Sequence, residues 1–227
     1  VTDAWAPQVN GVTRVQSSHI SFLRKQGNDV FVIHPGQFKT MPLPMYSEIR
    51  IALFPRRRVA KMIKEFQPDA VHIVTEGPIG WAARAECLKL KIPFTSWYHT
   101  KYQLYVDIRF RGLLRPIHAL QRRFHSAAVR TMVSTESLKK ELESTGFKNV
   151  VVVPLGIDID LFTRNPEPPL PSLPKPVFVF FSRLAPEKSP EDFLKLKLPG
   201  TKLVIGDGPD RTKLEEKYGK ENKFVGY

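Results

Sequence analysis

The chain has 227 residues, of which 42% are hydrophobic and 25% are charged, as in an ordinary folded globular protein. No apolar run approaches the ~20 residues that a membrane-spanning helix needs. The single cysteine, Cys87, excludes an internal disulfide and fits a reducing compartment. The net charge of +13 predicts a polyanionic neighbour: nucleotide phosphates, a nucleic acid or an anionic membrane surface.

A glycine-containing loop, residues 2–14, opens the first predicted helix. Apolar and aromatic residues then recur at helical spacing, and Gly27 supplies a stop. These residues are Val15, His19, Phe22 and Leu23. The N–H groups of a helix N-terminus are unpaired and the helix dipole favours an anion there, so Gly11 predicts a phosphate site. A buried strand should precede such a loop, and almost nothing does, so we expect a chain that is cut at its start.

Short β-branched runs alternate with helical patterns through the first two thirds of the chain. Strands are predicted at 30–34, 49–54, 69–74, 92–97, 131–134 and 149–153. Helices are predicted at 56–66, 80–90, 110–130 and 136–145. This alternation is typical of a doubly wound parallel sheet, an α/β fold whose ligands bind beyond the carboxyl ends of the strands.

A proline-rich stretch at 164–176 interrupts the pattern and reads as a semi-rigid linker. A second α/β pattern follows, with strands at 177–182, 201–205 and 223–226 and helices from about 190 and at 209–218. We therefore expect a first domain at 1–155, a linker at 156–176 and an incomplete second domain at 177–227.

The second domain opens with a strand-to-helix loop that carries two cations, Arg183 and Lys188. Ser189 is the expected N-cap, and Pro190 suits the first helical position. A fork of arginine donors beside a lysine charge fits a diphosphate, although two solvated surface cations explain the pattern equally well. The later run Gly206-Asp-Gly208-Pro is by itself a turn, and it is not a dinucleotide fingerprint.

Six motifs occur in one order: PQVNG at 7–11, TEGPIGWAAR at 75–84, SWYHTKY at 96–102, VPLGIDIDLF at 153–162, SRLAPEK at 182–188 and GDGP at 206–209. Together they resemble the retaining GT-B glycosyltransferases of family 4, in the branch of bacterial α-mannosyltransferases and glycolipid glycosyltransferases. The resemblance extends over essentially the whole chain. It implies a GT-B architecture, in which an N-terminal Rossmann-like domain faces a second one and the active site lies between them.

The resemblance also implies roles for individual residues. His99 is the expected catalytic residue beside the transferred sugar, while Glu76 and Gly77 face the acceptor. The residues expected at the donor diphosphate and sugar are Asn10, Gly11, Arg183, Lys188, Gly206 and Gly208. Preorganised cations and helix N-termini stabilise a leaving diphosphate, so no metal ion and no cofactor are expected.

The implied reaction moves a hexose, mannose or glucose, from GDP-mannose or a UDP-sugar to a lipid or glycan hydroxyl with retention. The implied location is cytoplasmic and peripheral, on the inner face of the membrane. The family's acidic E-x7-E motif would follow residue 227. Residues 1–227 alone are therefore expected to be inactive and poorly stable.

The stretch 109–125 is basic and amphipathic, with an apolar face that holds Phe110 and Phe124 and with arginines off that face. It fits an anionic membrane surface, at about 1 kcal/mol per cation, and equally an ordinary helix that docks on the sheet. The cationic residues at 56–58, Lys61 and Lys64 add to the first interpretation.

Each assignment has a simpler alternative. His99 at a strand end is by itself more often structural, Glu76 reads as a surface loop acid, and Asp3 as a turn former. His72 is expected to pack, and Gly80 to dock a helix. Other functions that fit are a GT-B epimerase or phosphorylase, or a basic membrane- or nucleic-acid-binding module. No nucleic-acid-binding motif is found, so no nucleic acid partner is expected.

Overall fold

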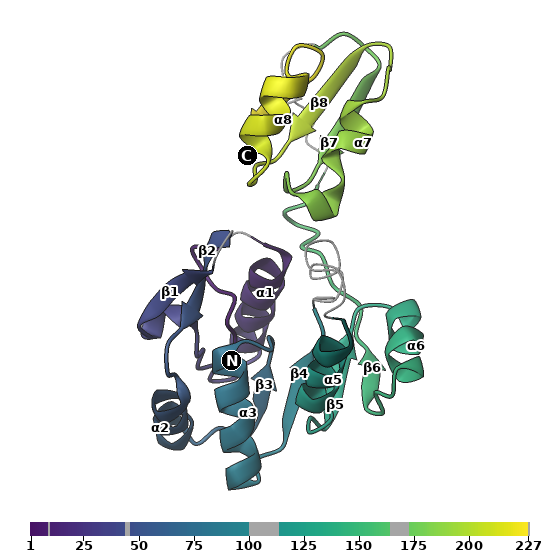
Figure 1. Ribbon diagram of the computed structural model, residues 1–227. Coiled ribbons are helices and arrows are strands. Elements are labelled where there is room, and N and C mark those ends of the chain that lie inside the picture. Colours follow the sequence, from purple (N-terminus) through teal and green to yellow (C-terminus); the bar gives the residue numbers. More distant parts are fainter. Residues whose placement is uncertain (9, 44–45, 100–113, 164–172, 227) are drawn as a thin grey trace. The chain divides into compact units, whose positions relative to one another are not determined.

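The computed structural model describes residues 1–8, 10–43, 46–99, 114–163 and 173–226, without the side chains of 46–48 and 114–116. The chain divides into two compact units, Val1–Gly156 and Ile157–Tyr227, which are coloured from purple to green and from green to yellow in Figure 1. The first domain was expected to end at residue 155, and the second was expected to begin at residue 177. Residues 164–172 of the expected linker lie outside the described residues.

The first unit is built on a parallel sheet of order β3-β4-β5-β6, as the alternating pattern predicts. Its strands are β3 (Val71–Ile73), β4 (Phe94–Trp97), β5 (Arg130–Val133) and β6 (Val150–Val152). Each lies within one residue of, or inside, the range predicted for it. Adjacent strands pair in one direction, with Ile73 opposite Ser96 and Trp97 opposite Met132, so all carboxyl ends share one edge.

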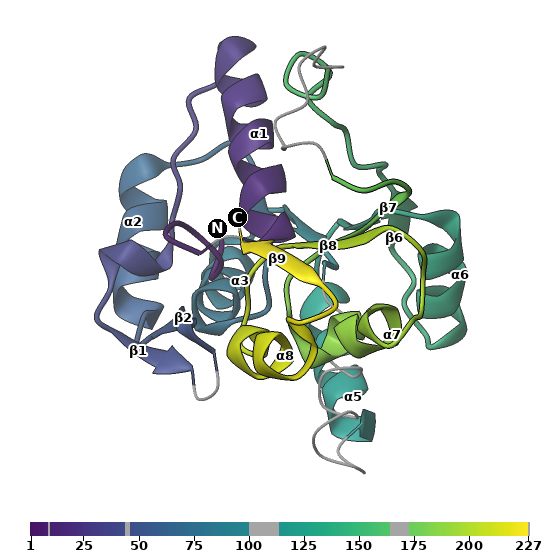
Figure 2. The same cartoon turned by 90° about the horizontal axis from the view of Figure 1, so that it is seen from above.

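Helices cover both faces of this sheet (Figure 2). On one side lies α1 (Gly11–Lys25), and on the other lie α3 (Pro78–Leu90) and α5 (Leu114–His125). Two further helices of the described residues are α2 (Arg56–Phe66) and α6 (Glu136–Ser144). Because side chains alternate along a strand, Trp97 of β4 contacts α1 through His19, whereas Ser96 contacts α5 through His125.

Two of the segments predicted as strands of the parallel sheet do not belong to it. Residues 30–34 form no strand in the described chain; Ile33 accepts one hydrogen bond from Thr2 N, and a single bond does not make a ladder. Segment 49–54 belongs to β2 (Tyr46–Ala52), which pairs antiparallel with β1 (Thr40–Leu43) as a hairpin outside that sheet. A short 3₁₀ helix, Pro35–Gln37, precedes the hairpin.

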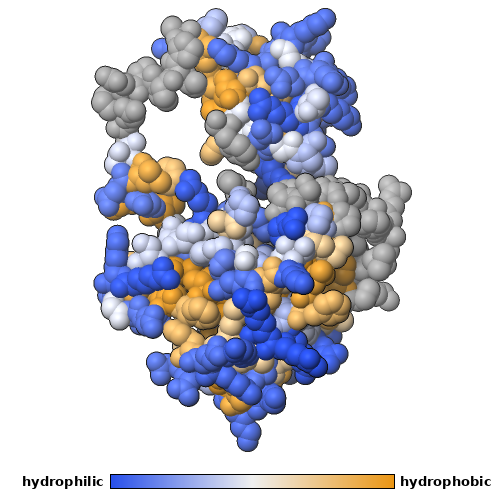
Figure 3. All heavy atoms as spheres, turned by 90° about the vertical axis from the view of Figure 1, so that its left-hand side faces the viewer, coloured by the Kyte–Doolittle hydropathy of each residue, from blue (hydrophilic) through white to orange (hydrophobic). Residues whose placement is uncertain are grey.

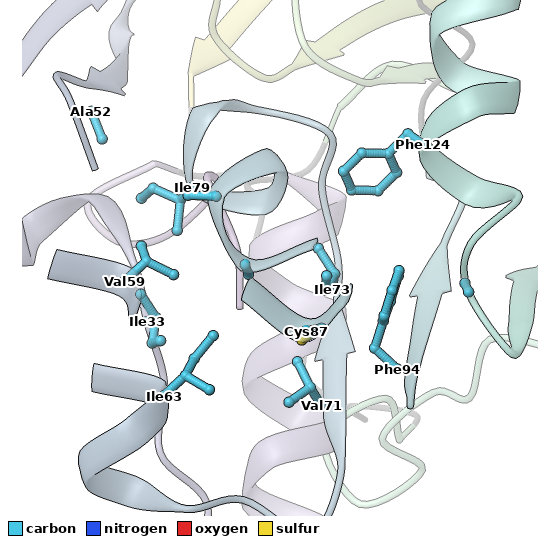
Figure 4. Packing of buried hydrophobic residues seen from close by; sticks show 13 residues of the cluster. Ile33, Ala52, Val59, Ile63, Val71, Ile73, Ile79, Cys87, Phe94 and Phe124 are labelled. Carbon is cyan, nitrogen blue, oxygen red and sulfur yellow. The ribbon is translucent and has the colours of Figure 1, made fainter. Parts of the chain in front are cut away.

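The core of the first unit lies between β3, β4 and the helices α2 and α3 (Figure 4). Val59 and Ile63 recur at helical spacing on α2 and meet Ile79 and Cys87 of α3. Glycine at position 80 is required there, because a Cβ atom would overlap the carbonyl oxygen of Thr75. The prediction that Gly80 docks a helix is thereby confirmed.

The second unit holds a smaller parallel sheet of order β7-β8-β9. Its strands are β7 (Val177–Phe181), β8 (Thr201–Ile205) and β9 (Lys223–Gly226), and its helices are η2 (Pro186–Lys188), α7 (Pro190–Leu194) and α8 (Arg211–Tyr218). A core of Leu184, Leu194, Val204 and Leu214 joins the helices to the sheet. As predicted, Ser189 is the N-cap residue of α7 and Pro190 is the first residue of the helix. The backbone of Ser189 is left-handed, at φ 47°, and its side chain makes no cap hydrogen bond.

No helix among the described residues is both long and apolar enough to cross a membrane.

Candidate active site

The N-terminus of α1 presents unpaired amide groups, as the glycine loop predicts. Asn10 is the N-cap, and its side chain accepts a hydrogen bond from Thr13 N at 3.0 Å, while Thr13 Oγ1 accepts from Asn10 N. The amides of Gly11 and Val12 donate to no acceptor in the part of the chain that the structure describes. A Cβ atom at Gly11 would meet no atom within 4 Å, so open space lies in front of this first turn. Both features suit an anion.

His99 lies two residues beyond the end of β4 and is held by α1. Its ring stacks on Trp97 at 4.9 Å, with 8° between the planes, and its Nε2 lies 3.4 Å from Nε2 of Gln16. Burial, and to a smaller extent the nearby His19, lower the pKa of His99 to about 4. The imidazole is therefore neutral at pH 7. Since the Gln16 amide nitrogen can only donate, His99 accepts at Nε2 and carries its proton on Nδ1.

Glu76 follows β3 at the same edge of the sheet and is not the surface loop acid that the simpler alternative describes. Its carboxylate Oε1 accepts from His125 Nε2 at 3.0 Å and from Gln121 Nε2 at 3.2 Å. Only 7% of the side chain is exposed. The buried pair fixes the carboxylate at the carboxyl end of the strand.

Gly77 is the N-cap of α3 and is required for packing. A Cβ atom there would overlap the carboxyl group of Asp3. That carboxyl group accepts hydrogen bonds from the amides of Ile79 and Gly80, at 2.8 and 3.1 Å, and from Thr75. Asp3 therefore caps α3 from another segment of the chain, a role beyond the turn former of the simpler alternative.

In the second unit, two loops at the carboxyl ends of neighbouring strands are joined by backbone hydrogen bonds. Leu184 N donates to Asp207 O at 2.9 Å, and Asp210 N donates to Leu184 O at 3.1 Å. Cβ atoms at Gly206 and Gly208 would overlap the carbonyl oxygens of Ser182 and Leu184. The two glycines therefore let one loop lie directly against the other.

This contact fixes the loop that carries the two predicted cations. Arg183 is half-buried, and Lys188 is exposed at the end of η2. Among the predicted residues, the structure thus groups Asn10, Gly11, His99, Glu76 and Gly77 on the first unit. It groups Arg183, Lys188, Gly206 and Gly208 on the second unit.

Sequence reasoning missed several residues that support these groups. Gln16 and Trp97 hold His99, and His125 holds Glu76. Gln16 carries a weak signal, because it lies on the helix that begins at Gly11. His125 lies 49 residues from Glu76 and carries none, since only the folded sheet brings the two together.

Two units with parallel sheets and polar loops at the carboxyl strand ends define an α/β protein of the Rossmann-like class. The family model described as Glycosyltransferase Family 4 matches residues 9–161, more than half of the chain. The chain therefore belongs to glycosyltransferase family 4, and the predicted family is confirmed.

Curated relatives align along nearly the whole chain. Sulfoquinovosyl transferase SQD2 of Arabidopsis thaliana is 27% identical over 92% of this chain and 46% of that protein. A GDP-mannose-dependent α-mannosyltransferase of Mycolicibacterium smegmatis is 27% identical over 95% of this chain and 64% of that protein. An α-monoglucosyldiacylglycerol synthase of Streptococcus pneumoniae is 28% identical over 95% and 56%. The chain thus spans about half to two thirds of the length of these relatives.

A solved structure shares the fold. Sucrose-phosphate synthase from Thermosynechococcus elongatus aligns with 77% of this chain and 52% of that chain, at a TM-score of 0.55 and 15% sequence identity. The predicted GT-B type of α/β fold, with Rossmann-like parallel sheets, is confirmed by this likeness.

Proposed function

We propose that the protein transfers a hexose from a nucleoside diphosphate sugar to a hydroxyl group of a lipid or glycan, with retention. One observation carries this proposal: in a family 4 chain, the open first turn of α1 and the neutral His99 lie together, joined by Gln16. The first turn offers amides to a phosphate, and the Nδ1–H group of His99 offers a donor to a sugar oxygen.

The second unit supplies the complementary chemistry in this proposal. The developing charge on the leaving diphosphate requires fixed positive groups, and Arg183 and Lys188 flank a loop that is held in place by Gly206 and Gly208. We include in the proposal that these cations stabilise the diphosphate without a metal ion or a cofactor. Glu76 would accept a hydrogen bond from the acceptor hydroxyl, beside Gly77.

The relatives narrow the substrates within the proposal. One is named for GDP-mannose-dependent mannosyl transfer, and another for making monoglucosyldiacylglycerol. Mannose and glucose are therefore the donor sugars to test first, and diacylglycerol is the first lipid acceptor. An epimerase or a phosphorylase with the same fold would release no glycolipid or glycoside from these substrates.

The experiment is a transfer assay on the full-length protein, with GDP-mannose and UDP-glucose as donors and with dioleoylglycerol or methyl α-mannoside as acceptor. We expect a product with the α configuration of the donor, by NMR of the anomeric proton, and activity that persists in EDTA. An inverted product, or the absence of transfer with every donor and acceptor pair, would contradict the proposal.

A membrane-facing role has separate support. Phe54 is 95% exposed and lies two residues before α2, whose first turn carries Arg56, Arg57 and Arg58. Arg122 and Arg123 of α5 are also exposed, whereas residues 109–113 of the predicted amphipathic stretch lie outside the described residues. Figure 3 faces the side of the first unit that carries β1 and α2 in Figure 1, and hydrophilic side chains surround smaller apolar patches there.

An exposed aromatic side chain next to clustered cations suits the surface of an anionic bilayer. We extend the proposal to peripheral binding on the cytoplasmic face. Co-sedimentation with vesicles of dioleoylphosphatidylglycerol should exceed that with dioleoylphosphatidylcholine, and Phe54→Ser should reduce it. Equal binding to the two vesicles would overturn this extension.

A further inference from the structure

A chain of hydrogen-bonding side chains crosses the interior of the first unit and ends on Glu76. His125 Nδ1 lies 2.8 Å from Ser96 Oγ, and Ser96 Oγ lies 3.2 Å from Thr131 Oγ1. At the other end, His125 Nε2 lies 3.0 Å from Glu76 Oε1. When the Ser96 hydroxyl donates to His125 Nδ1, the Nε2–H group of His125 donates to the Glu76 carboxylate, and such aligned hydrogen bonds polarise one another.

The imidazole in the middle of this chain has a single position. His125, Ser96 and Thr131 are each 0% exposed. The rings of Tyr98, Phe124 and Phe147 surround His125, with centroids at 5.6, 5.1 and 5.9 Å. Because close-packed side chains do not adjust freely, the Nε2–H group of His125 is aimed at Glu76 by the cage around it.

Within the described residues, the hydrogen bonds to the Glu76 carboxylate reach only one of its two oxygens. Oε1 accepts both from His125 and from Gln121. Oε2 accepts no hydrogen bond within the described residues and is not fully buried, although only 7% of the side chain is exposed. A buried carboxylate requires hydrogen-bond partners, so an oxygen without one suits a donor that a ligand brings.

This oxygen belongs to the same edge of the sheet as His99. Ile73 of β3 and Ser96 of β4 are directly opposite one another, and both strands run in the same direction. Glu76 lies three residues after Ile73, and His99 lies three residues after Ser96. The topology therefore carries both residues to the carboxyl edge, with Glu76 on the α5 side and His99 on the α1 side.

We propose that His125 is a positioning residue that fixes Glu76 so that its Oε2 accepts a hydrogen bond from the hydroxyl group of the sugar acceptor. The inference rests on the proposed glycosyl transfer and adds to it a residue outside the motifs of the sequence. His125 itself touches neither substrate. A purely structural network would stabilise the fold without any selective effect on the acceptor.

The test compares three variants of the full-length protein by steady-state kinetics. His125→Phe keeps an aromatic ring in the aromatic cage and removes both hydrogen bonds. His125→Gln keeps one side-chain donor. Val71→Ala opens a cavity at the other end of β3 and serves as the control for lost stability. Val71 is buried, and it lies opposite Phe94 rather than opposite Ser96 of the network. The acceptor probe is dioleoylglycerol in mixed micelles or methyl α-mannoside, whichever the wild type glycosylates.

We expect His125→Phe to reduce kcat/KM for the acceptor by about tenfold to a hundredfold, the usual effect of losing a hydrogen bond to a charged group. Acceptor-independent hydrolysis of the donor should stay within about twofold, because no donor contact changes. His125→Gln should recover part of the loss, and Ser96→Ala should cause a smaller one. Val71→Ala should lower the melting temperature without changing the acceptor KM.

Two results would overturn the inference, and they differ from a failure of the proposed function. The first is an unchanged acceptor kcat/KM in His125→Phe. The second is an equal loss in transfer and in donor hydrolysis, matched by Val71→Ala. A wild-type protein that transfers no sugar at all would instead overturn the proposed function, and the positioning role with it.

Discussion

The two units hold their predicted site residues by different means. In the first unit, the half-buried His99 and the buried carboxylate of Glu76 are oriented by partners far away in sequence, Gln16 at 83 residues and His125 at 49 residues. In the second, Arg183 and Lys188 lie on a loop fixed by backbone hydrogen bonds and by two glycines. The first unit therefore fixes the orientation of both side chains and keeps His99 neutral, whereas the second unit fixes the position of the loop that carries its two cations.

The largest expected effect comes from Gly206 in the second unit. Gly206→Ala would place a Cβ atom against the carbonyl oxygen of Ser182, at a backbone φ of +138°. We expect a loss of about 3 kcal/mol in the free energy of unfolding, from overpacking and backbone strain. Urea denaturation of the full-length protein measures it. Gly11→Ala is the matched control, since a Cβ atom there meets nothing within 4 Å. Equal losses in the two variants would contradict the packing argument.

His99→Ala tests the role proposed for the first unit. Removal of a neutral hydrogen-bond donor beside the sugar should lower kcat by about a hundredfold, within the usual range for a positioned polar group. The fold should remain, because Trp97 keeps its contact with His19. Transfer kinetics with circular dichroism as the folding control measure this. If kcat stays within twofold in a folded variant, His99 is structural.

Lys188→Ala tests the role proposed for the second unit and should have a smaller effect. Lys188 is exposed, so the folded state should lose almost no stability. We expect KM for the donor to rise by about tenfold, with the difference shrinking at 1 M salt because exposed charges are screened. A salt-independent effect would show that Lys188 acts through structure rather than through charge.

A difference in acid sensitivity should separate the two units. Burial lowers the pKa of His72 to about 3 and that of His99 to about 4, from an ordinary 6.5. Between those values and pH 6.5 the unfolded chain binds more protons than the folded one. The free energy of unfolding of the first unit therefore falls as the pH is lowered through this range.

The second unit contains no histidine. Its Glu191, whose pKa a hydrogen bond from Lys195 lowers to about 2, contributes stability that is lost only as the pH falls below its ordinary 4.5. Hydrogen exchange at pH 7 and pH 5 should thus show loss of protection in the first unit alone. His72→Phe should reduce that loss. A parallel loss in both units would contradict the assignment to the buried histidines.

Much of the fold was predictable because it depends on local periodicity. The predicted range 56–66 coincides with α2, and the strands β3 to β9 were each found near their predicted ranges. The failures occurred where pairing partners decide the outcome. Segment 30–34 has strand composition but only one ladder bond, and 49–54 joined a hairpin instead of the parallel sheet. Periodicity specifies which face of a segment is apolar, but not its neighbour.

The sequence by itself determined the family, the alternation of strands and helices, and the residue types at the carboxyl ends of the strands. It does so because motifs and hydrophobic spacing are properties of neighbouring residues. Only the tertiary structure decided that His99 is neutral and that the Glu76 side chain is buried against His125. It also decided that Gly206 and Gly208 lie where a Cβ atom would overlap the neighbouring loop. Burial and long-range hydrogen bonds set these properties, and both arise only when distant segments pack together.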